Sequence, residues 1–277
     1  MNCRKLFVSD MDGTLLGADS RVSRRSAEII SSLSREGALI TVATARTPGT
    51  VEPLLADTLT LPPAVVMTGA AMWSRQERRY RHTHLLSPEK ALSVCAVLEE
   101  RGISPMVYQT DNDGVLRMYC RAGGCATERR FKEERSHLHL KRIITCDNPA
   151  DMIAGAETIL ILATGPSELT ERATEPVEAV GGLSVSHYSD PLYPGAGFIE
   201  VFTEGVTKAR GVKDLKAITG AEHVTVFGDN LNDIPMMRVA DTAVAVANAL
   251  PEVKAVADVV IGPNTEDAVA RYIAANI

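Results

Sequence analysis

Short apolar runs alternate with amphipathic helical segments at both ends of the chain. Each run is short enough for a buried strand, and segment 23–36 repeats its apolar positions at helical spacing before it ends at Gly37. The same alternation resumes after about residue 195. The expected strands lie at residues 6–8, 39–43, 64–67, 223–227, 243–246 and 259–261. Strands that alternate with helices predict an α/β fold with a Rossmann-like, doubly wound parallel sheet, whose ligands bind at the carboxyl ends of the strands.

The central part of the chain has a different pattern, in which turn-linked extended runs replace the regular alternation. The expected elements are helices at 88–101, 127–135 and 167–180 and strands at 103–108, 115–119, 158–163 and 183–188. This pattern predicts an α+β domain inserted into the α/β core. We therefore expect a core made of residues 1–82 and 190–277 and an inserted domain at residues 83–189.

The most informative sequence is Asp10-Met11-Asp12-Gly13-Thr14, which closely follows the first apolar run. Alternate residues of an extended segment point the same way, so the carboxylates of Asp10 and Asp12 are expected to face one spot. Two carboxylates about 4 Å apart repel by roughly 4 kcal/mol at an effective dielectric constant near 20. A cation or a shared proton would offset this repulsion, which makes the pair a candidate metal and nucleophile site. The alternative is a solvated Asp-Gly turn.

The chain carries a second sequence of the same form, Asp111-Asn112-Asp113-Gly114. It lies between two extended runs, where an Asp-Gly pair predicts a hairpin turn with glycine at a positive φ angle. We assign this segment no chemical role. Neither segment has the later glutamate of a calcium-binding helix-loop-helix loop, so that function is excluded for both.

A second acidic cluster lies far downstream, at the end of the apolar run 223–227. Asp229 follows that strand, and a helix is expected from about residue 231, with Pro235 in its first turn, where a missing N–H costs little. Asp233, four residues after Asp229, then returns to the same helical face. If the two strands are neighbours in a parallel sheet, four carboxylates meet at its carboxyl edge. An oxygen-rich site without cysteine or histidine suits Mg²⁺ rather than zinc.

Two further segments suit an anionic substrate. The run 39–43 ends in Thr44 and Ala45, and a hydroxyl with free backbone N–H groups at a strand-to-helix turn can bind phosphate. Thr207 is expected to cap a helix that runs to about residue 219, and Lys208 lies in its first turn. The helix dipole disfavours a cation there, so a bound anion would explain Lys208. The alternative is a solvent-exposed lysine.

In this order, the segments resemble the four motifs of the haloacid-dehalogenase-like phosphatases. The D-x-D-G-T sequence at 10–14 matches motif one, and Thr44 matches motif two. Lys208 matches motif three, and the G-D-x-x-N-D sequence at 228–233 matches motif four. The spacing is closest to the Cof-type members, which carry a large cap between motifs two and three. The resemblance covers both ends of the chain well and the middle poorly.

Three positions depart from the usual sequence of that family. Motif two is commonly Thr-Gly-Arg, whereas this chain has Thr44-Ala45-Arg46. Alanine can supply the same N–H only where the turn does not need a positive φ angle. Thr68 stands where such proteins often have asparagine. Lys208 is followed by Ala209-Arg210-Gly211 rather than by an immediate glycine. None of the three departures removes a catalytic group.

The resemblance implies a covalent mechanism. Asp10 would attack the phosphorus of a phosphate monoester and form an aspartyl-phosphate, and Asp12 would serve as general acid for the leaving group and general base for water. The implied Mg²⁺ ligands are Asp10, the backbone carbonyl of Asp12, Asp229 and Asp233, the last directly or through water. The implied phosphate-binding residues are Thr44, Ala45, Lys208 and Asn232. The inserted domain would be a cap that closes over the site and contacts the leaving group.

The function that the resemblance implies is that of a Mg²⁺-dependent phosphatase, which acts on a small phosphorylated metabolite such as a sugar phosphate. Two alternative functions remain. A phosphohexomutase of the same superfamily would use the same aspartate pair but return the phosphoryl group to the sugar. A phospho-ligand sensor without turnover would need no acid/base group at Asp12. The sequence indicates neither which ester is cleaved nor the oligomeric state.

Composition limits the other function classes. The chain has 277 residues, enough for about two domains, and a net charge of −6. That charge argues against a nucleic-acid binder. Basic clusters lie at 75–81 and 129–142, the second interleaved with acids, and both are expected to be mainly solvated faces. No stretch approaches the ~20 apolar residues of a membrane span, and none follows Met1 as a signal peptide would. Together with five cysteines that lack a C-x-x-C pair, this predicts a cytoplasmic protein.

Overall fold

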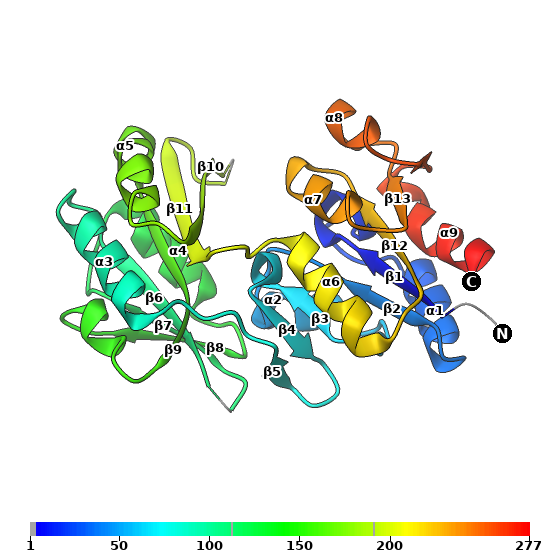
Figure 1. The fold of residues 1–277 in the computed structure, drawn as a ribbon, viewed down its shortest axis with the longest axis horizontal. Helices are drawn as coiled ribbons and strands as arrows, with labels where there is room; N and C mark the ends of the chain where they lie inside the picture. Colours follow the sequence, from blue (N-terminus) through cyan, green and yellow to red (C-terminus); the bar gives the residue numbers. More distant parts are fainter. Residues whose placement is uncertain (1–3, 112, 191) are drawn as a thin grey trace. The chain divides into compact units, whose positions relative to one another are not determined.

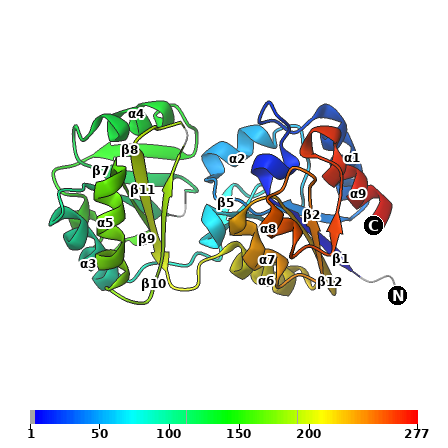
Figure 2. The ribbon, with the colours of Figure 1, turned by 90° about the horizontal axis from the view of Figure 1, so that it is seen from above.

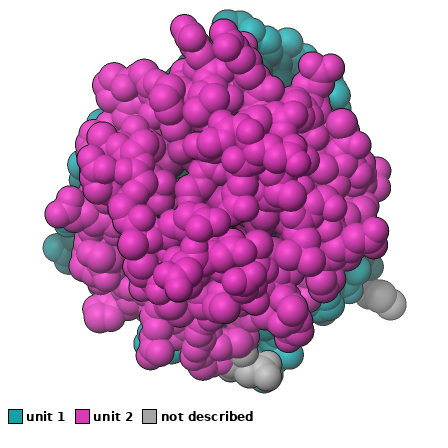
Figure 3. Space-filling model, turned by 90° about the vertical axis from the view of Figure 1, so that its left-hand side faces the viewer, with its two compact units in different colours: residues 1–82, 207–277 teal, residues 83–206 magenta. Residues whose placement is uncertain are grey.

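A computed structural model describes residues 4–111, 113–190 and 192–277 of the chain (Figure 1). The chain forms two compact units, which Figure 3 shows in different colours. Unit 1 contains Met1–His82 and Thr207–Ile277, and unit 2 contains Thr83–Val206.

Unit 1 is built on a parallel sheet with the strand order β14-β13-β12-β1-β2. Strand β1 (Lys5–Ser9) lies between β12 (His223–Gly228) and β2 (Leu39–Val42) and is parallel to both. Strands β13 (Thr242–Ala245) and β14 (Val259–Val260) extend the sheet beyond β12. The strands β1, β12 and β2 bury nearly all of their residues, as a sheet covered on both faces requires.

Helices cover both faces of this sheet (Figure 2). Helices α1 (Arg24–Arg35) and α9 (Ala268–Asn276) lie on one face. Helices α6 (Lys208–Thr219) and α7 (Ile234–Met237) lie on the other. This arrangement confirms the doubly wound, Rossmann-like sheet predicted from the alternation of strands and helices.

A small antiparallel sheet completes unit 1. Strand β3 (Ala64–Val66) joins the main sheet through a parallel bridge between Ala43 and Val65. It pairs with β4 (Ala71–Ser74), which in turn pairs with β5 (Arg79–Arg81). The remaining helical segments of unit 1 are α2 (Pro48–Leu54), α8 (Pro251–Lys254) and the short turns η1 (Met11–Leu15), η2 (Met67–Gly69), η4 (Leu231–Asp233) and η5 (Asn264–Glu266).

Unit 2 contains a sheet with the strand order β10-β11-β9-β6-β7-β8, antiparallel except between β7 and β8. Its strands are β6 (Pro105–Thr110), β7 (Leu116–Cys120), β8 (Lys141–Thr145), β9 (Glu157–Pro166), β10 (Leu183–Ser189) and β11 (Ala196–Thr203). Its helical segments are α3 (Pro88–Glu99), α4 (Ala126–Arg135), α5 (Ser167–Glu178) and the turn η3 (Pro149–Met152). This mixed sheet confirms the predicted α+β insertion.

The two faces of the sheet in unit 2 are packed by different helices. Leu98 of α3 and Val177 of α5 belong to one buried apolar cluster with Ile199 of β11. Phe198, the neighbour of Ile199 on the same strand, therefore points to the opposite face. There it contacts Phe131 of α4, with ring centroids 6.0 Å apart.

The second boundary of the inserted domain differs from the one expected at residue 190. Strand β11 belongs to unit 2, because it pairs antiparallel with β10 on one side and with β9 on the other. The chain returns to unit 1 only at Thr207. The sequence was misleading here because a buried strand followed by a helix gives the same pattern in either domain.

The second D-x-D-G sequence joins β6 and β7, which form an antiparallel pair as predicted, and Gly114 has a φ angle of 75°. Asn112 of that sequence lies outside the described residues. Segment 129–142 is mainly exposed or half-buried, as predicted, but Lys141 near its end is only 7% exposed. Lys141 opens β8, a strand that the sequence pattern did not predict.

In the described part of the chain, Cys95, Cys120, Cys125 and Cys146 are free thiols. Among those same residues, no helix combines the length and the apolar character that crossing a membrane would require.

Candidate active site

The predicted site residues lie at the carboxyl edge of the sheet in unit 1. Ser9 of β1 is opposite Phe227 of β12, so the residues that follow these parallel strands meet at one level. Asp10 follows β1, and its N–H donates to the Phe227 carbonyl at 2.9 Å. Asp229 follows β12. The sheet therefore brings together two acidic residues that are far apart in the sequence.

The ammonium group of Lys208 lies between two carboxylates at this edge. Its Nζ is 2.6 Å from Oδ1 of Asp10 and 2.7 Å from Oδ1 of Asp233, and Lys208 is 1% exposed. Burial alone would lower the pKa of Lys208, but the two carboxylates outweigh burial and raise it. The anion expected beside a lysine in the first turn of α6 is thus supplied by the protein itself.

Asp10 is 5% exposed and is influenced by both a positive and a negative neighbour, Lys208 and Asp233. Burial raises the pKa of Asp10 to about 7, with Lys208 acting in the opposite direction and Asp233 adding to the rise. A negative charge at this position therefore depends on positive partners close by.

Asp233 uses both of its carboxylate oxygens inside the protein. Oδ2 accepts the backbone N–H groups of Asp229 at 3.0 Å and Asn230 at 3.1 Å, while Oδ1 accepts Lys208. The helix predicted from residue 231 begins as the turn η4 and continues as α7, with Pro235 at its start. Asp233 thereby orients both the loop after β12 and the lysine.

Asp229 is held in place from the first motif. Oγ1 of Thr14 donates to Oδ1 of Asp229 at 2.7 Å. Burial is the largest cause of a raised pKa at Asp229. Gly13 has a φ angle of 78°, and a Cβ at this position would overlap the Asp229 carboxylate. Glycine meets both requirements, since it tolerates positive φ and has no Cβ.

Three carboxylates of the site can share one cation. Single oxygens of Asp10, Asp229 and Asp233 all lie within 4.8 Å of one another. A set of carboxylate oxygens without sulfur or nitrogen suits a hard divalent cation. The cluster therefore fits a divalent metal. Among the described residues, the side chain of Asp12 is not part of this cluster, so three of the four predicted carboxylates meet.

The side chain of Asp12 has a different partner. Strand β1 ends at Ser9, and Met11, which lies between the two acids, begins the turn η1. The segment from Asp10 to Asp12 is therefore not the continuous extended strand that was assumed for this pair. Instead, Arg46 donates from Nε to Oδ2 of Asp12 at 2.7 Å and from Nη2 to Oδ1 at 2.6 Å. The two acids of the first motif are therefore held by two different cations.

Residues 44–46, here called the Thr44 loop, present the hydroxyl of Thr44 and a free N–H group of Ala45. Thr44 is buried, and its Oγ1 accepts the Arg46 N–H at 3.1 Å. Ala45 does not have a positive φ angle, so alanine fits the position where the family commonly has glycine. Within the described part of the chain, the Ala45 N–H has no hydrogen-bond acceptor. This N–H group is available to a ligand oxygen.

Three consecutive residues after β3 have a left-handed backbone, with φ angles of 49° at Met67, 58° at Thr68 and 100° at Gly69. The Met67 N–H donates to the Arg46 carbonyl at 3.0 Å. A Cβ at Gly69 would overlap the Thr207 carbonyl. Left-handed backbone costs roughly 1–2 kcal/mol for a residue with a side chain, and least for asparagine or aspartate. Thr68 is therefore a strained residue where the family often has asparagine.

One predicted phosphate-binding residue has no side-chain partner among the described residues. Three other polar residues of the site were not predicted. Asn232 is exposed, and its side-chain amide has no hydrogen bond within the described part of the chain. The sequence interpretation gave no role to Thr14, Arg46 or Asn248, whose Nδ2 donates to the Gly13 carbonyl at 2.7 Å. Thr14 and Arg46 lie inside recognised motifs, which was a usable signal. No sequence motif pointed to Asn248.

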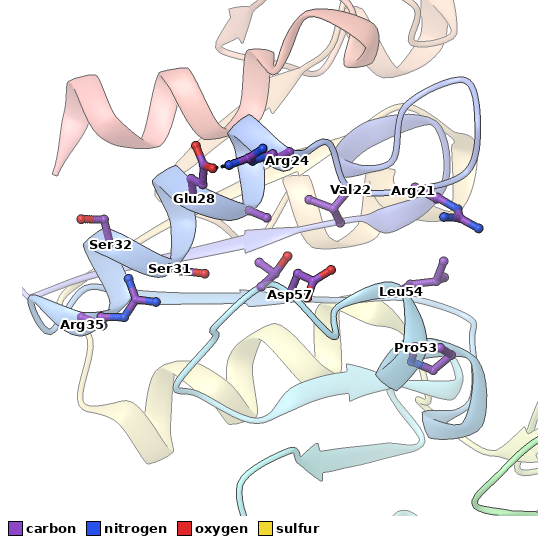
Figure 4. Close-up of a pocket in the computed structure, with 12 residues that line it drawn as sticks. Arg21, Val22, Arg24, Glu28, Ser31, Ser32, Arg35, Pro53, Leu54 and Asp57 are labelled. Atoms are coloured by element: carbon purple, nitrogen blue, oxygen red, sulfur yellow. Dashed lines mark hydrogen bonds and ion pairs between the residues drawn. The ribbon is translucent and has the colours of Figure 1, made fainter.

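A separate cavity of about 960 Å³ lies in unit 1 between α1 and the segment that follows α2 (Figure 4). Arg24 on α1 points toward Glu28, one turn further along, and pairs with it at 2.8 Å. Asp57 lies on the opposite wall. None of the site residues described above lines this cavity. We therefore assign it no part in the chemistry.

Comparison with known proteins places this chain in a family. Residues 7–273 match the model of the haloacid dehalogenase-like hydrolases. A Haemophilus influenzae protein provisionally named a phosphatase is 28% identical over 275 residues, 97% of both chains. The pyridoxal phosphate phosphatase YbhA of Escherichia coli is 24% identical over 288 residues, again 97% of both chains. The crystal structure of a haloacid dehalogenase-like hydrolase from Bacteroides thetaiotaomicron has the same fold, with a TM-score of 0.80, 20% identity and 99% of each chain covered.

The chain belongs to the haloacid dehalogenase-like hydrolases, and the resemblance to Cof-type phosphatases seen in its four motifs is confirmed. It is an enzyme of the phosphoric monoester hydrolase class. The family generally uses a divalent metal, and the cluster of Asp10, Asp229 and Asp233 fits one.

Proposed function

We propose that this protein is a Mg²⁺-dependent phosphatase that hydrolyses a small phosphate monoester through an aspartyl-phosphate on Asp10. The observation that carries this proposal is the buried contact between Asp10 and Lys208, beside two further carboxylates at the sheet edge. A carboxylate nucleophile needs fixed positive charge nearby, both to remain ionised and to stabilise the phosphoryl group that it attacks.

Asp10, Asp229 and Asp233, with the backbone carbonyl of Asp12, would hold the Mg²⁺ ion. When bound, the ion offsets repulsion between nucleophile and phosphate and stabilises negative charge during transfer. Asp233 already accepts two backbone N–H groups and the Lys208 ammonium. These bonds favour a water-mediated contact for Asp233.

The proposed reaction has two steps. In the first, an oxygen of Asp10 bonds to phosphorus while the bond to the leaving-group oxygen breaks, and that oxygen takes a proton from Asp12. In the second, water attacks the phosphorus, gives a proton to Asp12 and displaces the Asp10 carboxylate. One ester and one water thus become one alcohol and one inorganic phosphate.

Four groups would bind the non-bridging phosphoryl oxygens: the Thr44 hydroxyl, the Ala45 N–H, the Lys208 ammonium and the Asn232 amide. The Ala45 N–H and the exposed Asn232 amide support this assignment, because neither has a partner within the described residues. The Thr44 hydroxyl accepts a hydrogen bond from the Arg46 N–H and keeps its own proton to donate.

Unit 2 would be the cap that selects the leaving group. One relative is named for its action on pyridoxal phosphate, which supports a small phosphorylated metabolite as the substrate class here. A sugar phosphate or a similar metabolite is our proposal for this chain. The net charge of −6 argues against nucleic acid as the substrate, and the free thiols of unit 2 support action in the cytoplasm.

Phosphate release from 4-nitrophenyl phosphate, with and without Mg²⁺, tests this function. We expect metal-dependent release by the wild type and none by Asp10→Asn. The matched control is Asp111→Asn, which alters the first residue of the second D-x-D-G sequence and should leave release intact. Release retained by Asp10→Asn would contradict the assignment of the nucleophile.

The same preparation separates the two alternatives. With a hexose phosphate, free phosphate indicates a phosphatase, whereas an isomerised hexose phosphate indicates a phosphohexomutase. Binding of the ester without either product would indicate a sensor.

A further inference from the structure

Arg46 binds Asp12 through two parallel hydrogen bonds that occupy both carboxylate oxygens. Nε contacts Oδ2 at 2.7 Å, and Nη2 contacts Oδ1 at 2.6 Å. Two bonds from one planar edge fix the plane of a carboxylate as well as its position, which a single point charge cannot do. The side chains of Arg46 and Asp12 are 30% and 52% exposed, so the pair is in reach of a substrate.

The backbone of Arg46 is also anchored on both sides. Its N–H donates to Oγ1 of Thr44 at 3.1 Å, and its carbonyl accepts the Met67 N–H at 3.0 Å. The Thr44 N–H in turn donates to the Val65 carbonyl at 2.9 Å, which ties the loop to β3. The guanidinium is therefore carried by a loop whose position is set by the sheet.

We propose that Arg46 is a positioning residue that acts through Asp12, holding this general acid/base in the orientation needed for proton transfer, rather than a ligand of the phosphoryl group. The inference rests on the proposed function, because it assumes that Asp12 transfers a proton. The hydrogen bonding that Arg46 donates to Asp12 is the largest cause of a raised pKa at Arg46, which agrees with a guanidinium committed to this carboxylate.

If Arg46 positions Asp12, the effect of losing Arg46 should depend on whether the leaving group needs a proton. A basic leaving group must receive a proton as its bond to phosphorus breaks, whereas 2,4-dinitrophenolate leaves without one. The ratio kcat/KM covers substrate binding and the first chemical step, so it reports proton donation to the leaving group. Loss of a positioning residue for the acid should therefore penalise phenyl phosphate and spare 2,4-dinitrophenyl phosphate.

The experiment compares Arg46→Ala with the wild type on these two esters. General acid–base catalysis contributes about 10²–10⁴-fold, so we expect Arg46→Ala to lower kcat/KM for phenyl phosphate by about 10- to 100-fold. For 2,4-dinitrophenyl phosphate we expect a loss below about threefold, and an inhibition constant for inorganic phosphate within about twofold of the wild type. Equal losses on both esters, with weaker inhibition by phosphate, would show that Arg46 binds the phosphoryl group and would overturn the inference.

A double variant separates action through Asp12 from an independent role. If Arg46 acts through Asp12, then Asp12→Asn/Arg46→Ala should be no slower on phenyl phosphate than Asp12→Asn alone. Multiplying losses would overturn the inference. Arg24→Ala, which breaks an exposed ion pair on α1, is the control and should change neither ester. A wild type that hydrolyses neither ester overturns the proposed function, and the inference with it.

Discussion

The ammonium nitrogen of Lys208 lies 2.6 Å from a carboxylate oxygen of Asp10, although 198 positions separate the two residues in the sequence. Helix α6 begins at Lys208, and Thr207 caps it by accepting the Arg210 N–H at 3.2 Å. A lysine in this first turn opposes the helix dipole, and two buried carboxylates offset the conflict. The charges of the protein itself therefore hold the proposed nucleophile in place.

Replacing Lys208 by methionine should destabilise unit 1, because Asp10 and Asp233 would lose their shared buried cation. Breaking a buried pair by removing one partner typically costs about 3–5 kcal/mol, and we expect a loss of this order at pH 7. The loss should shrink at pH 5, since burial already raises the pKa of Asp10 and a protonated carboxyl needs no cation. Urea unfolding of both proteins at the two pH values measures this.

The control for that experiment is Lys216→Met on the same helix. Lys216 pairs with Asp241 at 2.8 Å, and the side chains are 39% and 37% exposed. An exposed pair contributes less than about 1 kcal/mol, so the control should stay close to the wild type. Similar effects of the two substitutions would contradict the description of Lys208 as the counter-charge of the site.

Thr14→Val should weaken metal binding. Thr14 donates to Asp229 at 2.7 Å, and removing a group that orients a metal ligand typically costs about 10- to 100-fold in metal affinity. The Mg²⁺ concentration for half-maximal phosphate release should rise by about this factor, with kcat at saturating Mg²⁺ little changed. Thr219→Val, whose hydroxyl bonds within α6, is the control. An unchanged Mg²⁺ requirement would argue against Asp229 as a ligand.

Thr68→Asn should stabilise the protein. Thr68 has a φ angle of 58°, which asparagine adopts more readily than a β-branched residue. We expect a gain of about 0.5–1 kcal/mol in the free energy of unfolding. The control Thr50→Asn alters a threonine in helix α2 and should bring no gain. A loss of stability in Thr68→Asn would show that the threonine side chain is needed for packing.

Lys141→Met should stabilise unit 2 in a pH-dependent way. Burial first, and Arg135 second, lower the pKa of Lys141 to about 7 from its ordinary value of 10.5, and its Nζ contacts the Tyr108 hydroxyl at 3.2 Å. Between about pH 7 and pH 10.5, Lys141 is protonated in the unfolded chain but not in the folded chain. The free energy of unfolding therefore rises with pH over this range. The stability cost of burying the charged Lys141 is complete below about pH 7 and is at most about 5 kcal/mol.

Urea unfolding at pH 6.5 and 9.5 measures this difference. The methionine variant should be more stable than the wild type at pH 6.5, and the gain should shrink at pH 9.5. Lys213→Met, which alters an exposed lysine of α6, should show no such trend. An equal gain at both pH values would mean that packing, and not the charge of Lys141, is responsible.

The order of the core elements could be predicted because each strand of the parallel sheet is a short, continuous apolar run bounded by turn residues. The end of the inserted domain could not, because β11 is as apolar as the core strands and only its pairing with β9 and β10 assigns it to unit 2. The burial of Lys141 was equally hidden. A lysine in a charged segment looks solvated until β8 pairs with β7 and places it beside Tyr108.

The meeting of Asp10, Asp229 and Asp233 followed from their positions at the ends of two strands and in the turn after the second. For Lys208 the sequence predicted a bound anion, and not the contacts with Asp10 and Asp233 that the structure has. The pairing of Asp12 with Arg46 did not follow from the sequence either, because it depends on how the turn η1 and the Thr44 loop approach each other. Sequence spacing carries no information about that approach. Neither does it indicate that Asn248 supports the Gly13 carbonyl from a distant loop.

The most direct test of the account is to trap the phosphorylated enzyme. Wild type, mixed with a radiolabelled phosphate ester and Mg²⁺, is quenched in acid during turnover, digested and mapped by mass spectrometry. The account predicts a hydroxylamine-sensitive phosphate on Asp10, and no labelled peptide from Asp10→Asn. Label on any other residue, or steady turnover by Asp10→Asn, would contradict the claim that Asp10 is the nucleophile.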